Sequence, residues 1–250
     1  MNDTTIRRPI KWLSSSETNV GVVRTVNEDS LLEKPEMGLW AVADGMGGHE
    51  AGDVASNMIV SSLNELERKI QLNDYVTAIE DKVNDVNDRL LEYAEIMLDG
   101  RIIGSTVAIL LIQGRVGVCM WAGDSRLYRY RTDELEQITF DHSQISELLK
   151  QGSITIDEAE NHPEANVITR AIGTSTDLFV DIDVFDVRVG DIYLLCSDGL
   201  YNSVAEESIT ETLQDDEIDT IAHELIEKSL TNQANDNVSA IVVKGVPRNA

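Results

Sequence analysis

The chain has 250 residues, and its 45 Asp and Glu against 20 Lys and Arg give a formal net charge of −25. This charge argues against a nucleic-acid partner, because proteins that bind nucleic acids present basic stripes to the phosphate backbone. The length, the 42% hydrophobic content and the 26% charged content fit one soluble globular domain over residues 1–250. No apolar run approaches the length of a membrane span.

We expect no export signal in the N-terminal segment. Arg7 and Arg8 loosely resemble a twin-arginine motif, but the apolar region that export requires does not follow them. We therefore expect residues 1–16 to form a flexible leader or an edge strand. Cys119 and Cys196 lie inside apolar runs and are expected to be small buried hydrophobic residues. Since the chain also lacks a CxxC motif, the expected compartment is a reducing cytoplasm.

Hydrophobic periodicity predicts both strands and helices. The apolar run 39–43 predicts a buried strand, and apolar residues at spacings of three and four predict helices over 50–70 and 74–98, packed as an antiparallel pair. Further strands are predicted over 105–112, 116–121, 127–130, 135–139, 179–187, 191–196 and 238–244, and further helices over 144–151 and 218–230. Strand hairpins together with paired helices indicate an α+β fold, in which helices cover antiparallel sheets.

Aspartates recur where predicted strands end or begin. They are Asp44, Asp124, Asp198 and Asp236. A single aspartate at a strand end is commonly an acidic turn, and Asp124 with Arg126 could equally form a structural turn between two strands. Because the pattern occurs four times, the sequence predicts one converging site.

Glu28 and Asp29 extend this set to six carboxylates. Two charges about 4 Å apart cost about 4 kcal/mol at an effective dielectric constant of about 20, so protons or cations must neutralise a converging group. Oxygen ligands without histidine or thiolate suit Mg²⁺ or Mn²⁺ rather than Zn²⁺ or copper. Two such ions, bridged by one carboxylate and one water, would make hydroxide available at neutral pH. Arg24 is the candidate for binding an anionic substrate, with a surface arginine as the alternative reading.

Eight sequence segments occur in the order found in one known enzyme family. They are RTVNED at 24–29, DGMGGH at 44–49, GST at 104–106, AGDSRLYR at 122–129, ITFDHS at 138–143, NVITRAIG at 166–173, LCSDGL at 195–200 and NDNVS at 235–239. Over residues 21–244 the chain resembles the bacterial PP2C-type (PPM) metal-dependent Ser/Thr protein phosphatases. The resemblance implies a four-layer αββα sandwich, in which pairs of helices flank two antiparallel β-sheets.

The same resemblance implies a centre of two Mn²⁺ or Mg²⁺ ions where the two sheets open at one edge. Asp44 would bridge both ions and the backbone carbonyl of Gly45 would bind the first, while Asp198 and Asp236 would hold the second. Asp124, together with Asp198, matches a third and weaker metal site of bacterial members.

Three further residues take roles by the same resemblance. Glu28 would bind a metal directly or through a water, Asp29 would support the ligands from behind, and Arg24 would bind the substrate phosphate. Residues 143–169 correspond to the family's flap, a mobile element beside the active site. His142 and His162 are expected to be loop residues in or beside this segment.

The implied reaction is direct attack by a metal-bridging hydroxide on a phosphoserine or phosphothreonine ester. Many eukaryotic members carry a histidine directly after the Asp-Gly pair, where it can protonate the leaving alkoxide. Met46 stands at that place and cannot donate a proton. His49 could serve as the acid or could only orient the loop, and a metal-bound water could serve instead, so the general acid stays unassigned.

The predicted function is a Ser/Thr protein phosphatase that acts on phosphorylated proteins and opposes a bacterial Ser/Thr kinase. One alternative is a catalytically silent module that binds phosphoproteins, but such a module should have lost metal ligands. A second alternative is a small-molecule phosphatase that uses the same centre.

Overall fold

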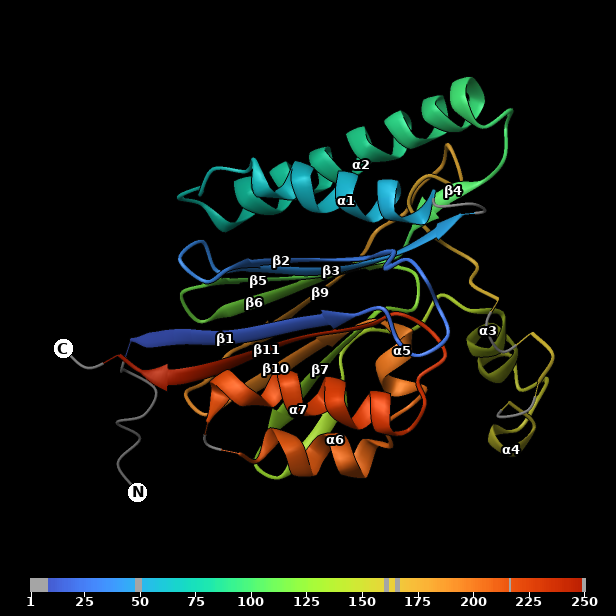
Figure 1. Ribbon diagram of the computed structural model, residues 1–250. Helices are drawn as coiled ribbons and strands as arrows, with labels where there is room; N and C mark the ends of the chain where they lie inside the picture. The colour runs from blue at the N-terminus through green and yellow to red at the C-terminus, as the bar shows by residue number, and fades with distance from the viewer. Residues whose placement is uncertain (1–8, 48–50, 160–161, 165–166, 216, 249–250) are drawn as a thin grey trace.

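The computed structural model describes residues 9–47, 51–159, 162–164, 167–215 and 217–248. Two antiparallel sheets pack face to face, and helices cover the outer face of each sheet (Figure 1). The predicted α+β fold with a four-layer αββα order is therefore confirmed. In the same residue ranges, no helix is long and apolar enough to cross a membrane.

One sheet has five strands among the described residues. They are β1 (Ile10–Asn19), β7 (Arg126–Arg131), β8 (Glu134–Gln137), β10 (Ile192–Cys196) and β11 (Val238–Pro247). Their order is β1-β11-β10-β7-β8, so β1 lies at an edge and pairs with β11 along its whole length. Helices α6 (Glu206–Leu213) and α7 (Ile218–Thr231) cover the outer face of this sheet (Figure 1).

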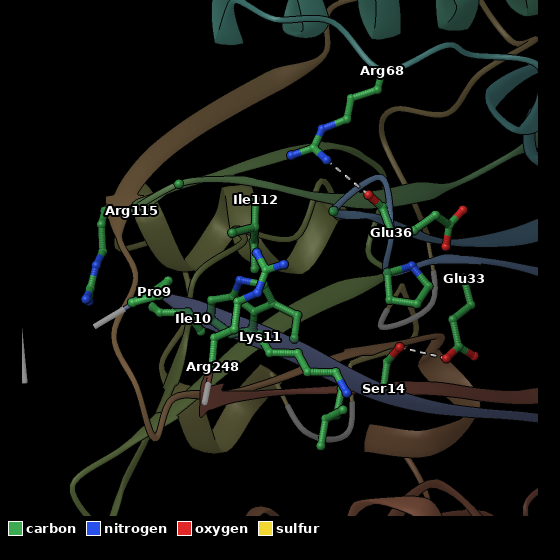
Figure 2. Close-up of a pocket in the computed structure, with 15 residues that line it drawn as sticks. Pro9, Ile10, Lys11, Ser14, Glu33, Glu36, Arg68, Ile112, Arg115 and Arg248 are labelled. Carbon is green, nitrogen blue, oxygen red and sulfur yellow. Dashed lines mark hydrogen bonds between the residues drawn. The ribbon is translucent and has the colours of Figure 1, made fainter. Parts of the chain in front are cut away.

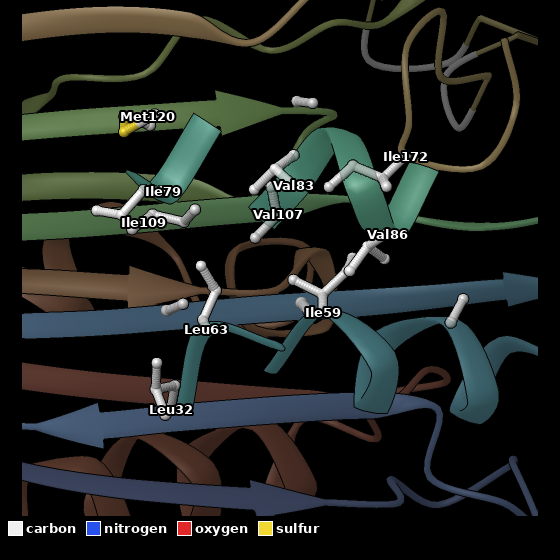
Figure 3. Packing of buried hydrophobic residues seen from close by; sticks show 14 of the residues in the cluster. Leu32, Ile59, Leu63, Ile79, Val83, Val86, Val107, Ile109, Met120 and Ile172 are labelled. Carbon is white, nitrogen blue, oxygen red and sulfur yellow. The ribbon is translucent and has the colours of Figure 1, made fainter. Parts of the chain in front are cut away.

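The second sheet has six strands in the described part of the chain. They are β2 (Asp29–Lys34), β3 (Leu39–Gly47), β4 (Ile103–Ser105), β5 (Val107–Gln113), β6 (Val116–Ala122) and β9 (Asp181–Asp186). Their order is β2-β3-β5-β6-β9, and β4 pairs with the end of β3. Helices α1 (Gly52–Asn64) and α2 (Leu72–Met97) cover this sheet. Figure 3 shows Ile59 and Leu63 of α1 packed in one cluster with Val107 and Ile109 of β5.

The middle layer of the core lies between the two sheets. Trp40 of β3, Trp121 of β6 and Tyr193 of β10 are buried there in one cluster. Cys119 and Cys196 are buried and unpaired, as the sequence predicts. Because strands of both sheets are buried on both faces, their apolar runs are nearly continuous, which explains why they were recognisable without strict alternation.

Three short helices lie at the end of the sandwich where β10 finishes. Helix α5 (Asp198–Tyr201) follows β10 directly, and α3 (Gln144–Lys150) and α4 (Ile156–Ala159) lie beside the layers (Figure 1). The segment that carries α3 and α4 is held at its base by a bridge between Ser143 and Ile168. It is the segment that the resemblance identifies as a flap.

The first long helix ends earlier than its periodicity predicts. We expected a helix over 50–70, but α1 ends at Asn64, and the side chain of Ile70 is 91% exposed. Leu66 is buried, although it lies in the connection to α2 rather than in the helix. Two apolar residues at helical spacing therefore extended the prediction beyond the last residue that packs as helix.

Candidate metal centre

The predicted aspartates gather at one end of the sandwich because the strands that carry them finish there. Asp44 lies in β3 and is paired across the ladder with Asp29, the first residue of β2. Asp124 follows β6, Asp198 opens α5 directly after β10, and Asp236 lies two residues before β11. The two sheets thus each contribute carboxylates to the same edge.

Asp29 connects the two sheets at this edge. Its Oδ2 accepts hydrogen bonds from the hydroxyls of Ser197 at 2.7 Å and Ser239 at 2.6 Å. Its Oδ1 is buried without a hydrogen-bond partner in the described structure. Burial raises the pKa of Asp29 to about 7, with a smaller contribution from the charges of Asp198 and Asp236, and the two serine hydrogen bonds oppose the rise.

Burial and neighbouring carboxylates raise the pKa values of both Asp44 and Asp198. Burial raises the pKa of Asp44 well above its ordinary value, and repulsion by Asp29, Asp198 and Asp124 adds to the effect. The pKa of Asp198 rises to about 6, through burial first and through the charge of Asp236 second. These mutual effects mean that the carboxylates are close enough to repel one another.

Asp124 is the member of the group farthest along the six-stranded sheet. Burial and the charge of Asp198 raise its pKa to about 7. Its backbone carbonyl accepts a hydrogen bond from the hydroxyl of Tyr201 at 3.1 Å, which ties this loop to α5. Arg126, two residues on, is occupied by Asp141 through Nε and Nη2 and lies over the ring of Tyr201, 3.5 Å from its centroid. Arg126 therefore has a structural partner, in line with the turn alternative for this residue.

Arg24 lies at the rim of the carboxylate group. Its Nη2 donates to Oδ2 of Asp236 at 2.7 Å, and the Arg24 side chain is 51% exposed. The hydrogen bond and the charge of Asp236 raise the pKa of Arg24 above its ordinary value. The loop before Arg24 is held close to Asp236, because a Cβ at Gly21 would meet the carbonyl oxygen of Asp236 at 2.1 Å.

Glu28 and Gly45 are packed tightly against the start of α1. The Oε1 atom of Glu28 accepts a hydrogen bond from the backbone N–H of Gly52 at 3.0 Å, and burial raises the pKa of Glu28. A Cβ at Gly45 would meet the carbonyl oxygen of Gly52 at 2.0 Å. Only glycine therefore fits at position 45 without moving the backbone.

The donor set fits a hard divalent cation. The converging ligands are carboxylate oxygens, the excess of negative charge keeps their pKa values high, and Asp29 leaves one buried oxygen unpartnered. Among the described residues, no group of three or more His, Cys, Asp or Glu side chains is already arranged to hold a metal ion. Several carboxylates are instead bonded to protein groups, such as Asp236 to Arg24 and Glu28 to Gly52.

His49, with its neighbours 48 and 50, lies outside the described residues. The structure therefore says nothing of its proposed role as general acid.

One polar residue to which the sequence assigned no role, Asn237, positions this site. Asn237 accepts from the backbone N–H of Glu28 at 2.8 Å and donates to the carbonyls of Val20 and Val26, which fixes the loop that carries Arg24. Its place in the run Asn-Asp-Asn before a strand was the available signal.

His142 lies in a loop, as expected, and its side chain makes several contacts that hold this loop in place. Its Nδ1 accepts the backbone N–H of Gly123 at 3.0 Å, and its ring stacks on Trp121. Its Nε2 lies 3.1 Å from Asp181, which also pairs with Arg170 at 2.7 Å. Desolvation lowers the pKa of His142. These contacts anchor the loop of Asp124 at the base of the segment that carries α3 and α4.

Comparisons with known proteins agree with this geometry. The model of the family "Protein phosphatase 2C" matches residues 22–235. The serine/threonine protein phosphatase PstP of Mycobacterium tuberculosis is 38% identical over 229 residues, which cover 91% of this chain and 44% of PstP. The chain thus spans less than half the length of that relative. The serine/threonine phosphatase stp of Listeria innocua is 35% identical, with 91% of this chain and 93% of stp covered.

A solved structure shares the fold. The catalytic domain of PstP in complex with two manganese ions superposes with a TM-score of 0.85 at 34% identity, covering 95% of this chain and 99% of the domain. With the family match, the relatives and the shared fold pointing the same way, this chain belongs to the protein phosphatase 2C family.

Proposed function

We propose that this protein is a metal-dependent serine/threonine protein phosphatase that hydrolyses phosphoserine and phosphothreonine esters. The observation that carries the proposal is the group of mutually repelling carboxylates, contributed by both sheets, beside the exposed guanidinium of Arg24. The relatives PstP and stp are named serine/threonine phosphatases, which supports the same reaction for this chain.

We assign two ions, Mn²⁺ or Mg²⁺, to this carboxylate group. Asp44, the carbonyl of Gly45, Asp198 and Asp236 would hold them, and Asp124 with Asp198 would form a third, weaker site. The two manganese ions in the PstP catalytic domain support this number. When bound, such ions supply Lewis acidity, which activates water at neutral pH and neutralises phosphate charge.

Residues around the ligands would prepare the site. Glu28 would contribute directly or through a water. Asp29, whose Oδ2 is fixed by Ser197 and Ser239, would support the ligands from behind with its free oxygen.

Arg24 would bind and orient the phosphate group. Its side chain is half exposed, so a phosphoserine on the surface of another protein can reach it without entering a deep pocket. Its guanidinium carries several N–H donors in one plane, which match phosphate oxygens better than a single ammonium would. In the reaction, the oxygen of water forms a bond to phosphorus while the bond to the serine or threonine oxygen breaks. The group that protonates the departing oxygen stays unassigned, with His49 as one candidate.

The partners in this proposal are phosphorylated Ser/Thr proteins and a cognate bacterial Ser/Thr kinase. The proposed compartment is the cytoplasm, and the two buried, unpaired cysteines are in keeping with a reducing environment. A silent phosphoprotein-binding module is not favoured, because Asp44, Asp198 and Asp236 are all present.

The test is hydrolysis of an aryl phosphate and of a phosphothreonine peptide, with Mn²⁺, with Mg²⁺ and with a chelator. We expect turnover of both substrates with metal and none after full chelation. Activity that survives chelation, or is absent with both metals, would overturn the proposal. Turnover of small esters with no turnover of phosphopeptides or phosphoproteins would favour the small-molecule alternative.

A further inference from the structure

A cleft opens at the end of the sandwich opposite the carboxylates. It has a volume of about 970 Å³ and is lined by both sheets, through β1 and Arg248 on one side and the β2–β3 and β5–β6 connections on the other (Figure 2). From Gly38 at this cleft the chain runs along β3 to Asp44 at the carboxylate group. Six residues of extended chain span about 20 Å, so the two sites are separate.

The cleft gathers cations in a chain that is strongly acidic. Lys11, Arg68, Arg115 and Arg248 line it, and they come from four separate segments of the chain. Figure 2 shows Lys11 and Arg248 near the centre of the view, with Arg68 above them and Arg115 to the left. The whole sequence has 20 basic residues against 45 acidic ones, so four cations in one cleft are a marked local reversal of the charge.

The acidic residues of the cleft do not cancel this charge. Glu33 and Glu36 are the carboxylates that line it, against Lys11, Arg68 and Arg248, while Arg115 has an interaction of its own. The carboxylate of Glu33 accepts hydrogen bonds from the hydroxyls of Ser14 and Ser16 on β1. Glu33 is therefore held by neutral groups instead of by the basic side chains.

Arg68 and Lys11 make few hydrogen bonds within the protein. Arg68 Nη1 donates to the backbone carbonyl of Glu36 at 3.4 Å, close to the limit of a hydrogen bond. Lys11 has no hydrogen bond or ion pair to its side chain in the described part of the structure. By contrast, Arg131 is paired with the buried Asp191 at 2.7 Å. Lys11 and Arg68 are thus exposed cations with donors to spare.

An apolar wall lies beside these cations. Ile10 and Trp12 of β1 lie on the face that packs against the core between the sheets, together with Ile112 of β5, and all three line the cleft with Pro35. A bare phosphate ion would need only the cations, whereas this wall suits the ring or hydrocarbon part of a larger ligand. Small-molecule sites of this kind have volumes of roughly 300–1,000 Å³ and combine an apolar lining with a few polar groups.

We propose that this cleft binds a small molecule that carries two or more phosphate groups on an apolar, ring-bearing body, such as a nucleoside diphosphate. The phosphates lie against Lys11 and Arg68, with Arg248 adding charge, and the two arginines match phosphate oxygens in a bidentate way. The ring lies against the apolar wall. Because the ligand touches both sheets, its binding also stabilises the sandwich.

The experiment is calorimetric titration of the full chain with ADP in the presence of a chelator. Without divalent cations ADP is repelled by the carboxylate group, so it does not bind there, and no phosphoester is hydrolysed. Binding of ADP to the cleft is therefore measured independently of the proposed phosphatase function. The fragments pyrophosphate and adenosine are titrated in parallel. We expect ADP to bind and each fragment to bind with a Kd at least about tenfold higher. Added salt should raise the Kd for ADP.

Matched double variants locate the site. Lys11→Gln with Arg68→Gln removes two exposed cations of the cleft, and we expect the Kd for ADP to rise at least about tenfold. Arg89→Gln with Arg101→Gln removes two exposed cations elsewhere and should leave the Kd within about twofold. Both positions of the test pair are exposed, so the fold is retained, and a thermal melt checks this.

Three results would overturn the proposal. They are that ADP fails to bind at millimolar concentration, that the two double variants raise the Kd for ADP equally, or that pyrophosphate binds as tightly as ADP. The last result would leave an anion site without any role for the apolar wall.

Discussion

The Nη2 atom of Arg24 lies 2.7 Å from Oδ2 of Asp236, although the two residues are 212 positions apart in the chain. The proposed phosphate-binding cation and a proposed metal ligand therefore form an ion pair with each other. A metal ion bound to Asp236 and a phosphate group bound to Arg24 would each compete with this ion pair. The pair predicts that substrate binding and metal binding at this site are coupled.

Replacement of Arg24 tests its role in phosphate binding. We expect Arg24→Ala to raise the KM for phosphate esters by about tenfold to a hundredfold, since a hydrogen bond to a charged group contributes about 1.5–3 kcal/mol. The Mn²⁺ concentration for half-maximal activity should fall, because Asp236 no longer has a competing cation. Steady-state kinetics over substrate and Mn²⁺ measure both values. Arg89→Ala, on the exposed face of α2, is the control, and an unchanged KM in Arg24→Ala would remove the assigned role.

Neutralising Asp44 separates activity from folding. We expect Asp44→Asn to lower kcat at least about a hundredfold, because the variant loses a proposed ligand to both ions. The chelated variant should remain folded and be at least as stable as the chelated parent protein, since burial and four neighbouring carboxylates oppose the charge of Asp44. Circular dichroism and thermal melts provide the check on folding. Near-normal turnover in Asp44→Asn would show that the metal assignment is wrong.

The raised carboxylate pKa values predict an unusual pH dependence of stability. Asp29, Asp124 and Asp198 have pKa values of about 7, about 7 and about 6 in the folded protein. An aspartate in an unfolded chain has a pKa of about 3.9. Between about pH 4 and about pH 7 the folded chain therefore binds more protons than the unfolded chain, and its free energy of unfolding falls as the pH rises through this window.

The measurement is a series of thermal melts of the chelated protein from about pH 8 to about pH 5.5, in which we expect Tm to rise by at least about 4 °C. Part of any rise comes from the overall negative charge, so the slope must be compared between variants. Asp124→Asn should flatten it, whereas Asp88→Asn, an exposed residue of α2, should change it little. Equal slopes in the two variants would contradict the electrostatic account. Saturating Mn²⁺ should raise Tm most at the high end of the range, because cations then replace the missing protons.

Much of the site could be predicted because it depends on local patterns. Asp44, Asp124 and Asp198 each follow a buried apolar run, and the ends of adjacent strands in a sandwich necessarily meet at one edge. Strand β2 was missed, since its sequence DSLLEK mixes charged and apolar residues without a clear period. Helix α6 was missed because it shows only Ile209 and Leu213 as an apolar pair.

Contacts between distant segments could not be predicted. The pairing of Arg24 with Asp236 and the contact of His142 with Gly123 both depend on how loops close over the finished sheets. A single sequence carries no signal for such contacts, since hydrophobic period specifies which face of an element is buried and not which polar side chains meet. The same reason explains why the cations of the opposite cleft, such as Lys11 and Arg68, were not seen as a group.

The last prediction concerns the hydroxyls that hold Asp29. Ser239 is buried, and its Oγ lies 2.6 Å from Oδ2 of Asp29. Ser239→Ala leaves a buried carboxyl with one fewer donor, which costs about 1–3 kcal/mol of unfolding free energy. Urea unfolding of the chelated protein near neutral pH measures this loss. The control is Ser62→Ala, because Ser62 is equally a buried serine but its hydroxyl has no hydrogen-bond partner in the described structure. We expect that change to be neutral or slightly stabilising, and an equal loss in both variants would show that the bond to Asp29 contributes nothing of its own.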